Sequence, residues 1–124
     1  MFEAIVEKST NLLKISWSGR VSANEAKSCV EQIELLLHEL QPGFRLLTDL
    51  SGLNAMDLEC VPHIERAMDL CQHGGVAMVV RIIPDPHKDI GLSIMSVFHY
   101  RRGTRLVTCQ TLEEAEMTLA SPTA

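Results

Sequence analysis

A nearly uninterrupted apolar segment at residues 76–83 constrains the fold of this chain more than any other feature. It is rich in β-branched residues and contains a single charge, Arg81. Such a segment is typical of a central strand in a parallel sheet, which is covered on both faces. A Gly-Gly pair before it is typical of a helix end, and an Asp-Pro pair after it is typical of a helix start. The sequence therefore predicts a buried strand between two helices.

Turn and capping signals divide the rest of the chain into alternating strands and helices. Ser22 and Glu25 form a capping-box pattern that opens a helix with apolar residues at spacings of three and four. The predicted strands are 2–8, 12–18, 44–50, 76–83 and 105–109, and the predicted helices are 22–40, 57–73, 85–100 and a last one from 111. This β-β-α-β-α-β-α-β-α order predicts one α/β domain over residues 1–120, with a mixed, mostly parallel sheet of about five strands covered by helices. Residues 121–124 are expected to fray.

The start of the second helix has two interpretations. Asp57 is a suitable N-cap, but Pro62 would then lie just past the first turn and remove a backbone hydrogen bond. Alternatively, Pro62 is itself the first helical residue, where proline costs little. Both interpretations place the start of the helix shortly after the third strand.

Composition narrows the classes of function. The chain has 124 residues, a net charge of −5 and few aromatic side chains. Nucleic-acid binding is excluded, because it needs a basic face or a stacking platform. The longest uncharged apolar run, residues 74–80, is far shorter than the ~20 residues of a membrane span. The first residues lack the pattern of a signal peptide, so a cytoplasmic location is expected.

The cysteines are scattered among apolar neighbours, which predicts reduced, buried thiols. Two Cys-His pairs, Cys60 with His63 and Cys71 with His73, suggest a metal site at first sight. On one helix, however, the pairs are separated by about 16 Å, too far to share one zinc ion. We therefore expect no metal and no cofactor. The four cysteines are Cys29, Cys60, Cys71 and Cys109.

Polar residues follow the third predicted strand directly. They are Asp49, Ser51, Gly52, Asn54 and Asp57. In an open α/β sheet, residues at this position lie at the carboxyl edge of the strands, beside the amino end of the next helix. Ligands and partners generally meet such a sheet there. The segment is therefore the main candidate site.

A second loop is expected at the same edge, with Asp85 and His87 after the fourth strand. His87 beside Ser51 would be one arrangement for nucleophilic catalysis, which requires a base within hydrogen-bond reach. Ser after Asp is more often a turn residue whose hydroxyl bonds nearby backbone. An enzyme is therefore the least favoured class.

Three segments, residues 46–53, 73–80 and 109–115, resemble the STAS domain family, which includes the anti-sigma-factor antagonists of bacterial partner switching. The element order is similar over residues 4–119. The resemblance implies a STAS-like fold and a protein partner, such as an anti-sigma factor or a switch kinase. In the antagonists, a kinase phosphorylates a serine at the start of the second helix, which changes the charge that the partner meets.

The phosphorylation motif is degenerate in this sequence. Residues 49–53 resemble it, but Leu50 replaces the first serine, and Ser51 lies about two helical turns too far from the Gly-Gly pair. Counting back from that pair reaches Asp57 instead. A permanent carboxylate at Asp57 would be stabilised by the helix N-terminus by ~0.3–1 kcal/mol.

The sequence thus predicts a non-catalytic interaction domain that docks a protein partner through residues 49–58 and the neighbouring loop. The alternative is a small-ligand or lipid carrier with an apolar pocket between the sheet and the second and third helices. A homodimer is compatible with either function.

Overall fold

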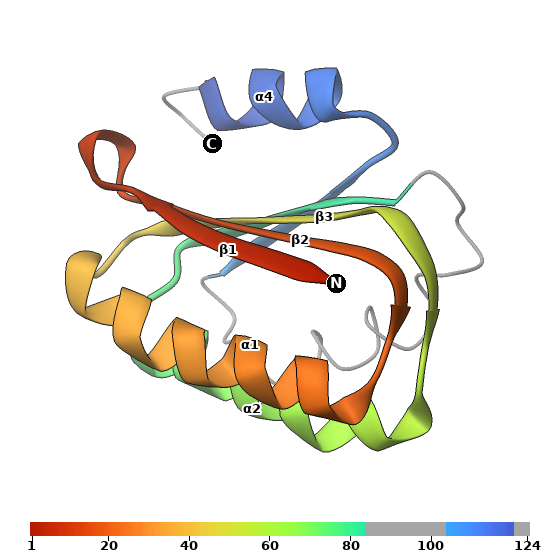
Figure 1. The fold of residues 1–124 in the computed structure, drawn as a ribbon. Helices are drawn as coiled ribbons and strands as arrows, with labels where there is room; N and C mark the ends of the chain where they lie inside the picture. Colours follow the sequence, from red (N-terminus) through yellow and green to blue (C-terminus); the bar gives the residue numbers. More distant parts are fainter. Residues whose placement is uncertain (84–103, 121–124) are drawn as a thin grey trace.

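One five-stranded sheet organises the chain, in the spatial order β1-β2-β3-β4-β5. The computed structural model describes residues 1–83 and 104–120 (Figure 1). The strands are β1 (Phe2–Glu7), β2 (Leu12–Val21), β3 (Arg45–Met56), β4 (Met78–Ile82) and β5 (Arg105–Cys109). The helices are α1 (Ala23–Leu36), α2 (Val61–His73) and α4 (Leu112–Ala120), with 3-10 turns η1 (Lys8–Thr10), η2 (Leu37–Glu39) and η3 (Leu58–Cys60).

The strand directions confirm the predicted fold class. β1 is antiparallel to β2, and β2 to β5 are mutually parallel. Helices α1 and α2 lie side by side on one face of the sheet, and α4 lies on the other (Figure 1). The third helix predicted at 85–100 and the tail at 121–124 lie outside the described residues.

The hydrophobic core has two unequal parts, one on each face of the sheet. The larger part lies under α1 and α2 and receives Leu13, Ile15 and Trp17 from β2, as their alternation predicts. The smaller part lies under α4, where Ala115 packs among side chains of the central strands. All five residues of β4 are buried, which confirms that this apolar segment is a central strand.

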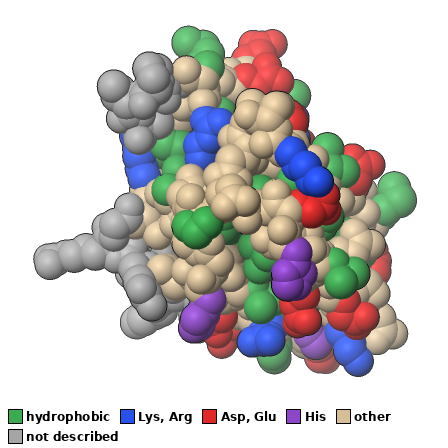
Figure 2. All heavy atoms as spheres, turned by 90° about the vertical axis from the view of Figure 1, so that its left-hand side faces the viewer, with side chains coloured by type: hydrophobic (Ala, Val, Ile, Leu, Met, Phe, Trp, Pro, Cys, Tyr) green, Lys and Arg blue, Asp and Glu red, His purple; other side chains and the backbone are tan. Residues whose placement is uncertain are grey.

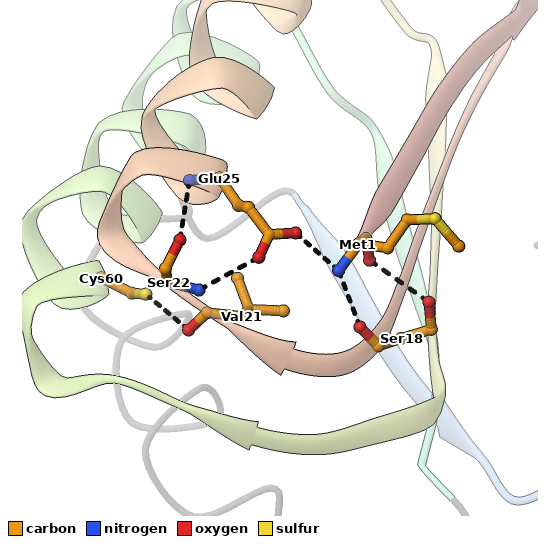
Figure 3. Close-up of polar contacts among 6 residues, drawn as sticks. All are labelled: Met1, Ser18, Val21, Ser22, Glu25 and Cys60. Carbon is orange, nitrogen blue, oxygen red and sulfur yellow. Dashed lines mark hydrogen bonds and ion pairs between the residues drawn. The ribbon is translucent and has the colours of Figure 1, made fainter.

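The start of α1 is fixed by the predicted capping box. The backbone N–H of Glu25 donates to Ser22 Oγ over 3.3 Å, and the N–H of Ser22 donates to Glu25 Oε1 over 3.5 Å (Figure 3). Two backbone donors at the helix start are thereby satisfied, which is typically worth about 1 kcal/mol. The Glu25 carboxylate also lies 2.6 Å from the amino group of Met1.

The end of α2 depends on a glycine. Gly75 has a φ of +90°, and a Cβ at this position would lie 3.1 Å from Pro42. The Gly75 carbonyl accepts a 2.7 Å hydrogen bond from the N–H of Gly43. The turn after α2 is therefore packed backbone to backbone against the turn before β3, and only glycine fits this approach without strain.

The prediction that the third strand ends at residue 50 is wrong. β3 continues to Met56 and stays paired with β2 as far as Val21. The register shifts twice along this pairing, between Ser16 and Ser18 and after Gly19. Such bulges let two strands continue side by side while the chain bends, so polar residues that resemble a loop belong to the sheet.

The second helix begins differently from either interpretation. The first helical residue of α2 is Val61, and Pro62 is the second. Proline is tolerated at this position, because the first N–H groups of a helix have no partner within the helix. The missing N–H of Pro62 therefore costs no hydrogen bond. The single turn η3 occupies the residues between Asp57 and α2.

Candidate functional site

A two-stranded arm dominates the carboxyl edge of the sheet. β4 ends opposite Asp49, at Ile82, whereas β3 runs on for seven further residues. Within the described part of the chain, this extension of β3 pairs only with the end of β2. Figure 1 shows the two strands curving together away from the sheet toward the starts of α1 and α2. We call this extension, residues 18–21 with 52–56, the arm.

Ser51 lies at the base of the arm and is exposed. Its hydroxyl donates to Asp49 Oδ1 over 2.6 Å, and its backbone N–H donates to the same oxygen over 2.9 Å. The two residues thus form a local turn of the kind that Asp favours. The expectation that Ser51 lies beside the amino end of the next helix is wrong, because the rest of β3 and η3 separate Ser51 from α2.

Gly52 allows the two strands of the arm to approach closely. A Cβ on Gly52 would lie 3.3 Å from Ser18 Cβ and 3.4 Å from the carbonyl oxygen of Trp17. This is the position at which the register with β2 shifts. Asn54, further along the arm, is exposed. Gly52 thus has a packing role, whereas Asn54 presents its amide to solvent.

Asp57 is held by an arginine that the sequence alone did not indicate. Arg20 Nη2 lies 2.8 Å from Asp57 Oδ1, and Arg20 Nε donates to the same oxygen over 3.0 Å. The Asp57 backbone N–H donates to the carbonyl of Val21, and the Asp57 carbonyl accepts from the N–H of Cys60. The carboxylate itself makes no capping hydrogen bond to η3. Asp57 therefore joins the arm to the start of α2 through its backbone and presents an Arg-paired charge.

Replacing Asp57 by Asn is expected to lower the free energy of unfolding by less than about 1 kcal/mol, because exposed ion pairs contribute little. The Arg20 side chain is largely exposed in this pair. Urea unfolding of Asp57→Asn, of Arg20→Gln and of the double variant measures the coupling. A loss above about 2 kcal/mol would show that the pair is a structural element rather than a surface feature.

Leu58 is the most exposed large apolar side chain of the described residues, at 84%. It begins η3, directly after Asp57, and so lies between the arm and α2. An exposed leucine next to an Arg-paired carboxylate offers a partner one apolar contact and one charged contact. Sequence reasoning missed Leu58, because exposure on a single turn leaves no periodic signal.

The thiol nearest to this edge does not form a reactive centre. Cys60 is buried and donates to the carbonyl oxygen of Val21 over 3.5 Å (Figure 3). Burial, together with the negative charge of Asp57, raises the pKa of the Cys60 thiol. A raised pKa leaves little thiolate to act as a nucleophile or a metal ligand.

The other chemical candidates can be placed only in part. All four cysteines are free and buried, as predicted. Residues 1–83 and 104–120 contain no group of three or more His, Cys, Asp or Glu side chains arranged to hold a metal ion. Asp85 and His87 lie outside the described residues, so their placement next to Ser51 remains a prediction.

The apolar pocket that a carrier would need is small in the described structure. A cavity of about 70 Å³ lies between the sheet and α2, lined among others by Trp17, Leu50 and Met68. This volume corresponds to about two water molecules, whereas ligand pockets are roughly 300–1,000 Å³. The predicted third helix, which would form the rest of the carrier's pocket, lies outside the described residues, so that pocket remains a prediction.

The opposite end of the molecule has an ordinary solvated surface. Figure 2 shows acidic, basic and histidine side chains interspersed on this end, with apolar side chains scattered between them. Lys8 and Glu39 form one of its exposed ion pairs, at 3.4 Å. Mixed charges of this kind indicate solvation rather than a specific site.

The fold is that of anti-sigma factor antagonists. An anti-sigma factor antagonist, SpoIIAA in its unphosphorylated form, superposes with a TM-score of 0.66 and 15% sequence identity over 96% of this chain and 97% of its own. A SpoIIAA-like protein of the DUF3478 family from Shewanella loihica gives 0.71 and 14% over 96% and 94%. An anti-sigma factor antagonist from Mycobacterium paratuberculosis gives 0.60 and 18% over 98% and 96%.

These likenesses show the fold, and the sequence adds no further relative. The chain matches no family model and no curated protein. None of the described helices is long and apolar enough to cross a membrane. The class defined by the fold is therefore α/β domains of the SpoIIAA type, spanning nearly the whole chain.

Proposed function

We propose that this protein is a non-catalytic regulatory domain that docks a protein partner at residues 49–58. The observation that carries the proposal is Leu58, an exposed apolar side chain beside the Asp57–Arg20 pair, at the start of η3. The fold shared with anti-sigma factor antagonists supports a partner of the anti-sigma factor or switch-kinase type. Asp57 supplies a permanent negative charge at this surface, so docking does not require phosphorylation of Ser51.

The surface formed by residues 49–58 combines an apolar centre with a polar rim, as protein interfaces do. Leu58 provides an apolar anchor, and the exposed side chains of Ser51 and Asn54 on the arm provide polar contacts at its rim. Truncating a hot-spot residue at the centre of an interface costs about 2 kcal/mol or more, whereas rim contacts contribute little. The proposal therefore assigns most of the affinity to Leu58.

A matched pair of leucines tests the proposal. Leu58→Ser is expected to lose a partner that the wild-type protein captures from a lysate of its own cells. Leu35→Ser is expected to retain it, because Leu35 is also exposed, at 71%, but lies on the outer side of α1. Isothermal titration with the purified partner should show at least a tenfold weaker Kd for Leu58→Ser, which corresponds to about 1.4 kcal/mol. Equal binding by both variants, or no captured protein, would contradict the proposal.

A further inference from the structure

A groove lies on the other face of the sheet, between α4 and strands β1 to β3. Its volume is about 440 Å³, within the range of binding sites. Ile5 on β1 and Leu112 on α4 line it and are 46% and 49% exposed, while the buried side chains of Leu12 and Leu47 lie deeper. The groove therefore has an apolar interior that opens to solvent along two exposed apolar side chains.

Helix coverage of this face is incomplete in the described structure. α4 packs over the central strands through Ala115 and Leu119. Across the part of the chain that the structure describes, no second helix lies beside it over β1 and β2. Three neighbouring strands span about 10 Å, which is close to the diameter of one helix. The strands β1 to β3, which line the groove, are thus together about as wide as one helix.

The charges that line the groove determine which kind of ligand it favours. Four carboxylates line it, those of Glu3, Glu7, Asp49 and Glu116, against the two basic side chains of Lys14 and Arg45. These basic side chains are already engaged. Lys14 Nζ lies 2.9 Å from Glu7 Oε2, and the Arg45 guanidinium donates to the backbone carbonyls of Leu119 and Thr10. The excess negative charge favours a cationic occupant.

A second copy of the chain does not meet this requirement. Two such grooves facing each other would both bring an excess of carboxylates to the interface, and each chain carries a net charge of −5. Like charges placed opposite each other at an interface are strongly unfavourable. The same argument excludes an anionic ligand.

We propose that this groove is a second docking site, which takes an amphipathic helix of a partner protein with an apolar face flanked by Lys or Arg. The apolar face would pack on Ile5 and Leu112, and the basic residues would meet Glu3 and Glu116. This is recognition of a helix in a groove, with anchors at helical spacing. The site is separate from Leu58 and does not depend on the function proposed for residues 49–58.

A labelled 14-residue Leu/Lys peptide with leucines at helical spacing is the probe, and its Leu/Glu counterpart is the control. We expect the Leu/Lys peptide to bind, measured by fluorescence anisotropy, and the Leu/Glu peptide not to bind. Glu116→Lys on α4 should raise the Kd of the Leu/Lys peptide about fivefold. The charge-matched Glu31→Lys, on exposed α1, should leave the Kd nearly unchanged. Ile5→Ser should weaken binding, whereas Leu58→Ser should not.

Amide chemical shifts then locate the bound peptide. The peptide is expected to move the signals of β1 and α4. The proposal is overturned if neither peptide binds, if Glu31→Lys weakens binding as much as Glu116→Lys, or if the shifts map to α1, α2 or residues 51–58. Equal binding of the two peptides would also overturn it, because the charge argument would then fail.

Discussion

Replacing Phe44 by Ala is expected to lower the free energy of unfolding by about 3–5 kcal/mol. Phe44 is fully buried and is the largest such side chain in the core. Its ring is packed against Gly74, where an added Cβ would lie 3.3 Å from Phe44 Cε1. The backbone of Phe44 also links the turn before β3 to the turn after α2. Its N–H donates to the carbonyl of Gln41, and its carbonyl accepts from the N–H of Ala77. The free energy of unfolding of a small domain is about 5–15 kcal/mol in total. This single change therefore removes a large share of the stability.

Urea unfolding followed by circular dichroism measures this effect. Leu35→Ala, on the exposed side of α1, is the control and should change the free energy of unfolding by less than about 0.5 kcal/mol. If Phe44→Ala cost no more than Leu35→Ala, the packing between the start of β3 and the end of α2 would be wrong.

The second large effect is a loss of stability in alkaline solution. Burial raises the pKa of the Cys29 thiol to about 12, and burial with the nearby Cys29 raises the pKa of Cys71 to about 12. In the unfolded chain these thiols lose their protons from about pH 9 upward, whereas in the folded protein they keep them. The unfolded state is therefore favoured as pH rises from about 9 to 12. Each thiol should lower the free energy of unfolding by roughly 2 kcal/mol between pH 9 and pH 11.

Single variants separate this effect from the titration of lysine and tyrosine. Cys29→Ala and Cys71→Ala each remove one titrating thiol and leave the other groups in place. The stability difference between wild type and either variant should therefore change by roughly 2 kcal/mol in favour of the variant from pH 9 to pH 11. A difference that is independent of pH would show that these thiols reach solvent in the folded protein.

The local signals in the sequence predicted most of the described fold. The apolar run at 76–83, the capping box of Ser22 and the glycines after α2 each act within a few residues, so they can be recognised without knowledge of the rest of the chain. The four buried cysteines follow from their apolar neighbours in the same way. The alternation of strands and helices that the turn and capping signals mark predicted the mostly parallel sheet, as observed.

The candidate site was predicted less well, because it depends on contacts between distant segments. Residues 51–55 are polar and resemble a loop, yet pairing with the end of β2 makes them a strand. Asp57 meets Arg20 across 37 positions of the sequence. The exposure of Leu58 follows from the geometry of a single turn. None of these features has a local signature, so the sequence alone could not place Ser51 within the sheet, pair Asp57 with Arg20 or indicate Leu58.

The arm connects the starts of the two long helices, α1 and α2. Its strand from β2 leads directly into the capping box of α1, and its strand from β3 leads through η3 into α2. The hydrogen bond from the Asp57 N–H to the Val21 carbonyl ties these exits together. The amino ends of α1 and α2 are therefore held to each other at the corner of the fold that carries Leu58.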